Sequence, residues 1–242
     1  MKQLVSAVLL IAFTLSVAPD ARADSADDAK AALAAFERQD FKAALVLLDK
    51  VLEDKTLPPQ AQAAVLVYHA GAQYGLGDGD AALADFKKAA AIDPKSLDAQ
   101  TNLAIVYQER RLYELAVNHN RQVVEILKTA QPSPQTVVAN NRLAWLLATS
   151  PEAKVRDGKA AIDITTGSLT LMTTNWPNAN SQLMANTHDT LAAGYAEAKR
   201  FKDAIATEQK AIAEIGAADP GLKAEFEKRL VSYQAGKPWR LN

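Results

Sequence analysis

The sequence predicts an all-α fold made of repeated helix pairs, and three observations support this prediction. About a fifth of the 242 residues are alanine, whereas only 6% are aromatic. Alanine is the best intrinsic helix former, and strands prefer β-branched and aromatic residues. The hydrophobic content of 49% is too high for a disordered chain. Finally, one residue pattern recurs along the chain, which indicates a repeat architecture.

Charge and cysteine content exclude several classes of protein. The chain has 27 Lys and Arg against 28 Asp and Glu, a net charge of -1, so it lacks the basic excess of a nucleic-acid-binding domain. It contains no cysteine, which excludes a disulfide framework, a zinc–thiolate site and the modification that anchors a lipoprotein. Such a chain must be stabilised by packing alone.

Residues 1–23 are predicted to be a secretory signal peptide. Lys2 precedes an apolar stretch from Leu4 to Val17, and Ala21-Arg22-Ala23 forms a small-residue cleavage pattern. As a helix the stretch would rise only about 21 Å, which is short of a hydrocarbon core of roughly 30 Å. We therefore expect cleavage after Ala23 and a periplasmic or secreted protein with no stable membrane insertion.

Five segments share small residues at positions where two helices would meet. In the first helix of each pair this position holds Ala32, Ala70, Ala104, Ala144 and Ala192. In the second helix two positions hold Ala44 and Val51, Ala82 and Ala89, Ala116 and Val123, Ala161 and Ser168, and Ala204 and Ala211. The members of each pair are two helical turns apart on one face, where small side chains let antiparallel helices approach closely.

This pattern resembles the tetratricopeptide repeat, a helix-turn-helix unit of about 34 residues, which is also the spacing of Ala82 and Ala116. Aromatic residues typical of the repeat are kept where Phe41, Tyr113 and Phe201 begin second helices. The resemblance implies an α-solenoid of about five repeats in residues 24–217. The expected repeats are 25–58, 59–94, 97–130, 135–172 and 183–217. Each would bury its apolar face against its neighbours.

Two segments depart from the repeat length. The turn of the fourth repeat is expanded to residues 149–158, and a long polar linker at 173–181 follows its second helix. If the array has a hinge or a division, we expect it near residues 172–182. A single continuous solenoid is nevertheless the favoured interpretation.

Residues 218–242 are predicted to form a capping helix and a tail. Leu222, Phe226 and Leu230 share one face at a spacing of four. The charged side chains lie on the other faces at Lys223, Glu225, Lys228 and Arg229. Repeat arrays need such a terminal helix with a polar outer side. Trp239 in the tail is expected to pack back on the cap.

No catalytic, cofactor or metal site is expected. His69, His119 and His188 are isolated in sequence and have no metal-ligand spacing, and His69 lies at a helix-packing position. The segment from Gly75 to Asp80 superficially suggests a phosphate or calcium loop but lacks the further residues that either loop needs. It is interpreted as the turn of the second repeat.

The resemblance implies that first helices line a concave groove. The candidate binding residues are Tyr74, Asn102, Ile105, Gln108, Asn141, Arg142, Trp145 and Asp189. In this hypothesis polar groups bond a peptide backbone, Ile105 and Trp145 bury its side chains, and Arg142 pairs with an acidic group. Packing between repeats is an equally open role for Trp145.

The sequence therefore favours a non-catalytic module that binds a protein or peptide partner of unknown identity, and no nucleic acid. The first alternative is a structural subunit of an envelope or export complex. The second is an accessory protein to an enzyme that acts on cell-wall glycans. The oligomeric state is left open.

Overall fold

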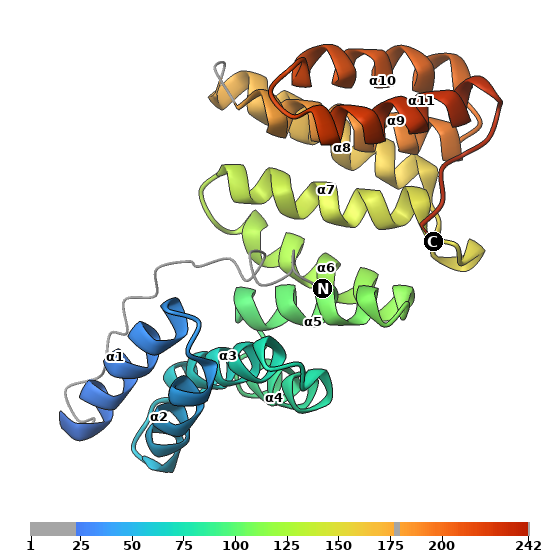
Figure 1. The fold of residues 1–242 in the computed structure, drawn as a ribbon. Coiled ribbons are helices and arrows are strands. Elements are labelled where there is room, and N and C mark those ends of the chain that lie inside the picture. The colour runs from blue at the N-terminus through green and yellow to red at the C-terminus, as the bar shows by residue number, and fades with distance from the viewer. Residues whose placement is uncertain (1–22, 177–179, 242) are drawn as a thin grey trace. The chain divides into compact units, whose positions relative to one another are not determined.

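The computed structural model describes residues 23–176 and 180–241, and within these ranges the chain is helical without strands. The predicted signal peptide lies outside the described residues, apart from Ala23. The repeats consist of α1 (Ala23–Glu37) and α2 (Phe41–Glu53), α3 (Pro59–Gly75) and α4 (Gly79–Ile92), α5 (Leu97–Glu109) and α6 (Tyr113–Lys128), α7 (Pro134–Thr149) and α8 (Gly158–Asn175), and α9 (Ser181–Glu197) and α10 (Phe201–Ile215). Helix α11 (Pro220–Gln234) follows them (Figure 1). The all-α prediction is confirmed.

The chain divides into two compact units, Met1–Arg111 and Leu112–Asn242. In the N-terminal unit, α3 packs on α1, α2, α4 and α5. In the C-terminal unit, α7 packs on α6, α8 and α9, while α10 packs on α9 and α11. The division does not fall near residues 172–182, where the sequence placed a possible hinge. The helices that flank that segment, α8 and α9, pack directly on each other.

The small residues identified in the sequence are buried as expected. The first-helix positions Ala32, Ala70, Ala144 and Ala192 have no exposed surface, and Ala104 has 2%. The ten second-helix positions are all buried too, including Ser168, the one polar residue among them. Closely packed helices need such small side chains because a larger one would force the backbones apart.

Four of the five helix pairs are joined by the same kind of short turn. Its middle residue has a positive φ, which is 61° at Gln39, 90° at Gly77, 59° at Arg111 and 60° at Lys199. This region of conformational space is easy for glycine and costly for other residues. In the second pair the Asp78 carboxylate then accepts a hydrogen bond from the Ala81 backbone N–H at 3.0 Å. The segment from Gly75 to Asp80 therefore forms a turn, as interpreted from the sequence.

The fourth pair has a longer connection, which contains a short 3₁₀ helix at Ala153–Val155. Asp157 begins α8 by accepting a hydrogen bond from the Ala160 N–H at 2.9 Å. Its own N–H donates to the Leu147 carbonyl at 2.9 Å, which closes the expanded loop against the end of α7. Gly158 lies where α8 meets the C-terminal end of α9. A Cβ atom there would be only 2.9 Å from the Ala198 nitrogen.

Helix α11 covers the apolar end of the C-terminal unit. Phe226 has no exposed surface and packs with Ala185, Ala211 and Ile215, while Leu222 contacts the edge of this cluster. Tyr233, also fully buried, packs with alanines of α9 and α10. This confirms the apolar face predicted for the cap. None of the helices in the described ranges is long and apolar enough to cross a membrane.

Candidate functional site

The candidate binding residues of the N-terminal unit lie on α3 and α5, and two of the four already have partners. The Tyr74 hydroxyl donates a hydrogen bond to Glu109, which joins the two helices. Burial, followed by this hydrogen bond, raises the pKa of Tyr74 to about 12. The Asn102 amide donates to the Asp98 carbonyl of its own helix at 2.9 Å. Ile105 is partly buried, and Gln108 is exposed.

Two of the candidates in the C-terminal unit belong to the core instead of an open surface. Asn141 is 8% exposed, and its amide donates to the Thr187 hydroxyl at 2.8 Å, which connects α7 with α9. Asp189 is 6% exposed and accepts a hydrogen bond from Arg229 of α11 at 3.0 Å. The repeat pattern places both residues on first helices, but α9 and the cap cover them. They cannot contact a partner in this state.

Arg142 and Trp145 remain as accessible candidates one turn apart on α7. Arg142 is half-buried, and burial lowers its pKa. Within the described ranges, no hydrogen bond or ion pair engages its guanidinium. Trp145 is partly exposed, and the Arg229 guanidinium lies 4.8 Å from its ring centroid. Trp145 thus contacts the cap and also retains exposed surface.

Arg229 lies among three aromatic rings in a tryptophan–arginine cluster, formed by Trp145, Phe226, Arg229 and Trp239. Its guanidinium is 5.6 Å from the centroid of Phe226 and 5.7 Å from that of Trp239. Only 13% of its side chain is exposed. The prediction that Arg229 lies on the polar outer side of the cap is therefore wrong. Cation–π contacts and Asp189 compensate for its burial.

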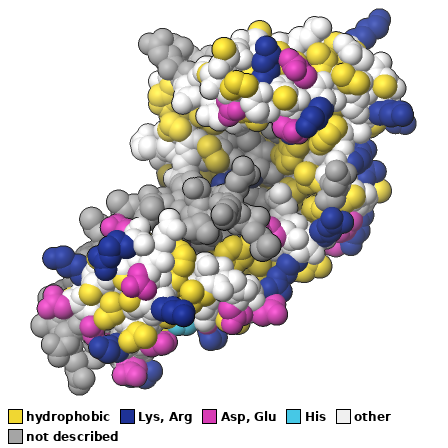
Figure 2. Space-filling view, in the orientation of Figure 1, with side chains coloured by type: hydrophobic (Ala, Val, Ile, Leu, Met, Phe, Trp, Pro, Cys, Tyr) yellow, Lys and Arg dark blue, Asp and Glu magenta, His cyan; other side chains and the backbone are white. Residues whose placement is uncertain are grey.

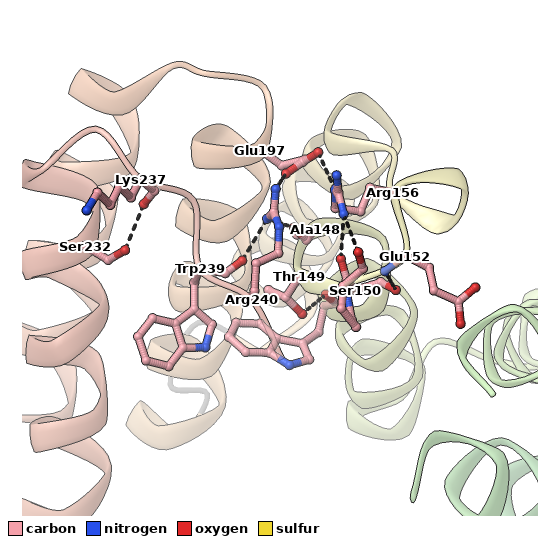
Figure 3. A network of polar contacts seen from close by, with 12 residues as sticks. Ala148, Thr149, Ser150, Glu152, Arg156, Glu197, Ser232, Lys237, Trp239 and Arg240 are labelled. Atoms are coloured by element: carbon pink, nitrogen blue, oxygen red, sulfur yellow. Dashed lines mark hydrogen bonds and ion pairs between the residues drawn. The ribbon is translucent and has the colours of Figure 1, made fainter. Parts of the chain in front are cut away.

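The C-terminal tail returns to the fourth repeat, as Figure 3 shows. Glu197 lies at the end of α9. One of its carboxylate oxygens accepts a hydrogen bond from Arg156 at 2.9 Å, and the other accepts one from Arg240. Arg156 also donates to the carbonyls of Ser150 and Pro151, at 3.0 Å each. A single carboxylate therefore joins the expanded loop, α9 and the tail.

Two backbone groups of the fourth repeat complete the attachment of the tail. Arg240 donates to the Ala148 carbonyl at 3.2 Å, and the Leu241 N–H donates to the Thr149 carbonyl at 2.9 Å. These carbonyls at the end of α7 have no partner further along their own helix. Trp239 packs against the cluster around Tyr233. The expectation that Trp239 packs back on the cap is confirmed.

Solved structures of helical repeat proteins are similar to this architecture. BtubC (BKLC) from P. vanneervenii matches with a TM-score of 0.64 at 18% identity, over 81% of this chain and 83% of that one. The nearly identical TPR-like repeats of a Podosopora anserina kinesin light chain match with a TM-score of 0.61 at 19% identity, over 82% and 99%. MamA from MSR-1 matches with a TM-score of 0.58 at 18% identity, over 81% and 98%. The chain has the tetratricopeptide-repeat fold.

At these identities the tetratricopeptide likeness concerns the fold alone. No protein-family model and no characterised protein sequence matches the chain. Figure 2 shows lysines and arginines interspersed with acidic side chains on the displayed face, in keeping with the near-neutral net charge. Binding chemistry in this tetratricopeptide chain therefore depends on individual side chains.

Two histidines of the tetratricopeptide array join neighbouring helices. His69 lies between two acids, with Nδ1 at 2.7 Å from Asp85 and Nε2 at 3.2 Å from Asp49. Burial raises the pKa of Asp85, but hydrogen bonds from Lys88 and His69 outweigh this effect and lower it. His188 is buried and lies 2.7 Å from Glu214. Over the described ranges, no group of His, Cys, Asp and Glu is placed to hold a metal ion.

Proposed function

We propose that this chain is a non-catalytic interaction module that binds an acidic polypeptide segment at Arg142 and Trp145 on α7. Arg142 carries the proposal. Its guanidinium is half-buried, and no counter-ion engages it within the described residues. Partial burial of a charge without a partner is unfavourable, and a partner carboxylate would compensate for it with charge-assisted hydrogen bonds.

Trp145 supplies the apolar part of the proposed site. It is partly exposed one helical turn from Arg142, and Arg229 fixes its ring through a cation–π contact at 4.8 Å. Tryptophan and arginine are the residue types that dominate the energetics of protein interfaces. A ring already held in place loses little conformational freedom when a partner binds. The pair therefore suits an acidic side chain next to an apolar one.

The proposal also includes an exported location and the absence of catalysis. The location rests on the predicted signal peptide, so the partner would be another exported or envelope protein. The non-catalytic role is supported by His69 and His188, whose rings form hydrogen bonds with Asp85 and Glu214 of neighbouring helices. Size-exclusion chromatography separates this module from a structural subunit of an envelope complex. A stable monomer fits the module, and an obligate large assembly fits the subunit.

We expect Arg142→Ala and Trp145→Ala each to weaken binding of acidic peptides about tenfold or more, because each removes a principal contact. The measurement is fluorescence anisotropy with a library of labelled peptides that contain Asp or Glu beside an apolar residue. Each peptide has a counterpart with Asn or Gln in place of the acid. The wild-type protein should prefer the acidic member of a pair.

The matched control is Arg121→Ala, which removes the same charge from an exposed position on α6. It should bind like the wild type. Equal binding by wild type, Arg142→Ala and Trp145→Ala would contradict the site. Equal binding of acidic and amide peptides would contradict the proposed role of the guanidinium.

A further inference from the structure

A cluster of ionisable groups is buried where α9, α10 and α11 meet. Asp189 of α9 is 6% exposed, and Glu208 of α10 and Tyr233 of α11 have no exposed surface. Arg229 of α11 donates to Asp189 at 3.0 Å. The cluster therefore contains two carboxyl groups but only one directly paired cation. Both carboxyls would be negatively charged at neutral pH if they titrated normally.

The hydrogen-bonding pattern of Glu208 indicates that it holds a proton. Glu208 is buried close enough to Asp189 for the negative charge of Asp189 to raise the pKa of Glu208. Both Glu208 oxygens are buried and receive no donor hydrogen bond from the described residues. Asp189, by contrast, accepts a hydrogen bond from Arg229 and is the better place for the negative charge. A protonated Glu208 beside an ionised Asp189 satisfies these observations together.

We propose that Glu208 and Asp189 form a proton-binding site, and that the shared proton holds the cap helix α11 on the tetratricopeptide array. Without the proton, two adjacent negative charges would be buried beside a single guanidinium. Such an arrangement is strongly unfavourable, so α11 and the tail would separate from α9 and α10.

The electrostatics of the neighbouring elements agree with this assignment. Burial, followed by the charge of Asp189, raises the pKa of Glu208 to about 10, although Arg229 opposes this effect. Burial also raises the pKa of Asp189. The remaining groups that face the pair are Tyr233 and Arg240 of the tail. Burial raises the pKa of Tyr233, and the charge of Arg240 opposes this effect. Among the described residues, Arg229 is therefore the cation that opposes the raised pKa of Glu208, and it already pairs with Asp189.

The direction of the pH dependence follows from proton counting. The ordinary pKa of glutamate is 4.5, whereas that of Glu208 in the folded protein is about 10. Between these values the folded state holds a proton that the unfolded state has released. Folding thus becomes less favourable as pH rises through this window. For this one proton, the folding equilibrium constant falls about tenfold per pH unit.

The test compares wild type with Glu208→Gln in urea unfolding from pH 6 to pH 10. Glutamine keeps the shape and a hydrogen-bond donor but cannot ionise. We expect the unfolding midpoint of the wild type to fall with rising pH and that of Glu208→Gln to change much less. The control Glu225→Gln removes an exposed carboxyl from α11 and should follow the wild type. Parallel profiles for wild type and Glu208→Gln would overturn the proposal.

Infrared spectroscopy tests the proton directly and does not depend on the stability of a variant. The wild type at neutral pH should show the carbonyl stretch of a buried, protonated carboxylic acid. This band should be absent from Glu208→Gln. In the wild type it should disappear at alkaline pH, where loss of the proton releases the cap. Emission from tryptophan, including Trp145 and Trp239 beside Arg229, should change over the same pH range. A wild-type spectrum without the protonated-acid band would refute the site.

Discussion

Replacing Phe226 with alanine is expected to lower the free energy of unfolding of the C-terminal unit by about 3–5 kcal/mol. Phe226 has no exposed surface, and its ring fills the space between Ala185, Ala211 and Ile215. These neighbours are too small or too constrained to fill the resulting cavity. The ring also contacts Arg229, so its loss weakens the tryptophan–arginine cluster. Urea denaturation followed by circular dichroism measures the change.

The matched control for Phe226 is Val231→Ala on the same helix. Val231 is 64% exposed, so its truncation should change the unfolding free energy by less than about 0.5 kcal/mol. If the two variants were equally stable, α11 would not be packed on the array as described.

Two glycines of α8 should respond to alanine in opposite directions. At Gly158 a Cβ atom would lie 2.9 Å from the Ala198 nitrogen and 3.1 Å from the Gly194 carbonyl oxygen. Backbone atoms cannot move aside without separating α8 from α9, so Gly158→Ala should cost about 1–3 kcal/mol. At Gly167, in the same helix, no atom lies within 4 Å of the added carbon. Gly167→Ala should stabilise the helix by about 0.5–1 kcal/mol.

Thermal unfolding of the two glycine variants provides the comparison. Because both substitutions add one methyl group to the same helix, differences in composition cancel. A lower melting temperature for Gly158→Ala together with a higher one for Gly167→Ala is the expected result. A stabilising Gly158→Ala would mean that α8 and α9 do not approach as closely at that point.

The sequence predicted the repeats well because their packing depends on local chemistry. Ala82 and Ala89, for example, are small, lie on one face and are fully buried. The turns were less accessible to prediction. Gln39, Arg111 and Lys199 adopt positive φ without being glycine, so their residue types carry no signal for it. The division after Arg111 lies in one of these ordinary turns and leaves no mark in the sequence.

The candidate site was predicted only in part, because side-chain burial depends on elements distant in sequence. Position in the repeat identified Arg142 and Trp145, but it also selected Asp189, which pairs with Arg229 of the cap. Helical periodicity assigns an arginine to the solvent side, and it gives no indication that two tryptophans and a buried acid surround it. The packing of Trp239 on the cap was predicted, whereas no sequence pattern indicated that Arg240 contacts Glu197 and Ala148.

The attachment of the tail has a consequence for the order of folding. Stacked repeats make contacts mainly with adjacent segments, whereas Arg240 reaches Ala148 across 92 residues of sequence. Closing a long loop costs more entropy and delays contact formation, so the tail should dock after the helices have paired.

In stopped-flow refolding, the fluorescence change that reports Trp239 should lag behind the recovery of helical circular dichroism. Simultaneous signals would place tail docking within the main folding step. With a lag, Glu197 would meet its second arginine only at the end of folding, and the final gain in kinetic stability would come from that late contact.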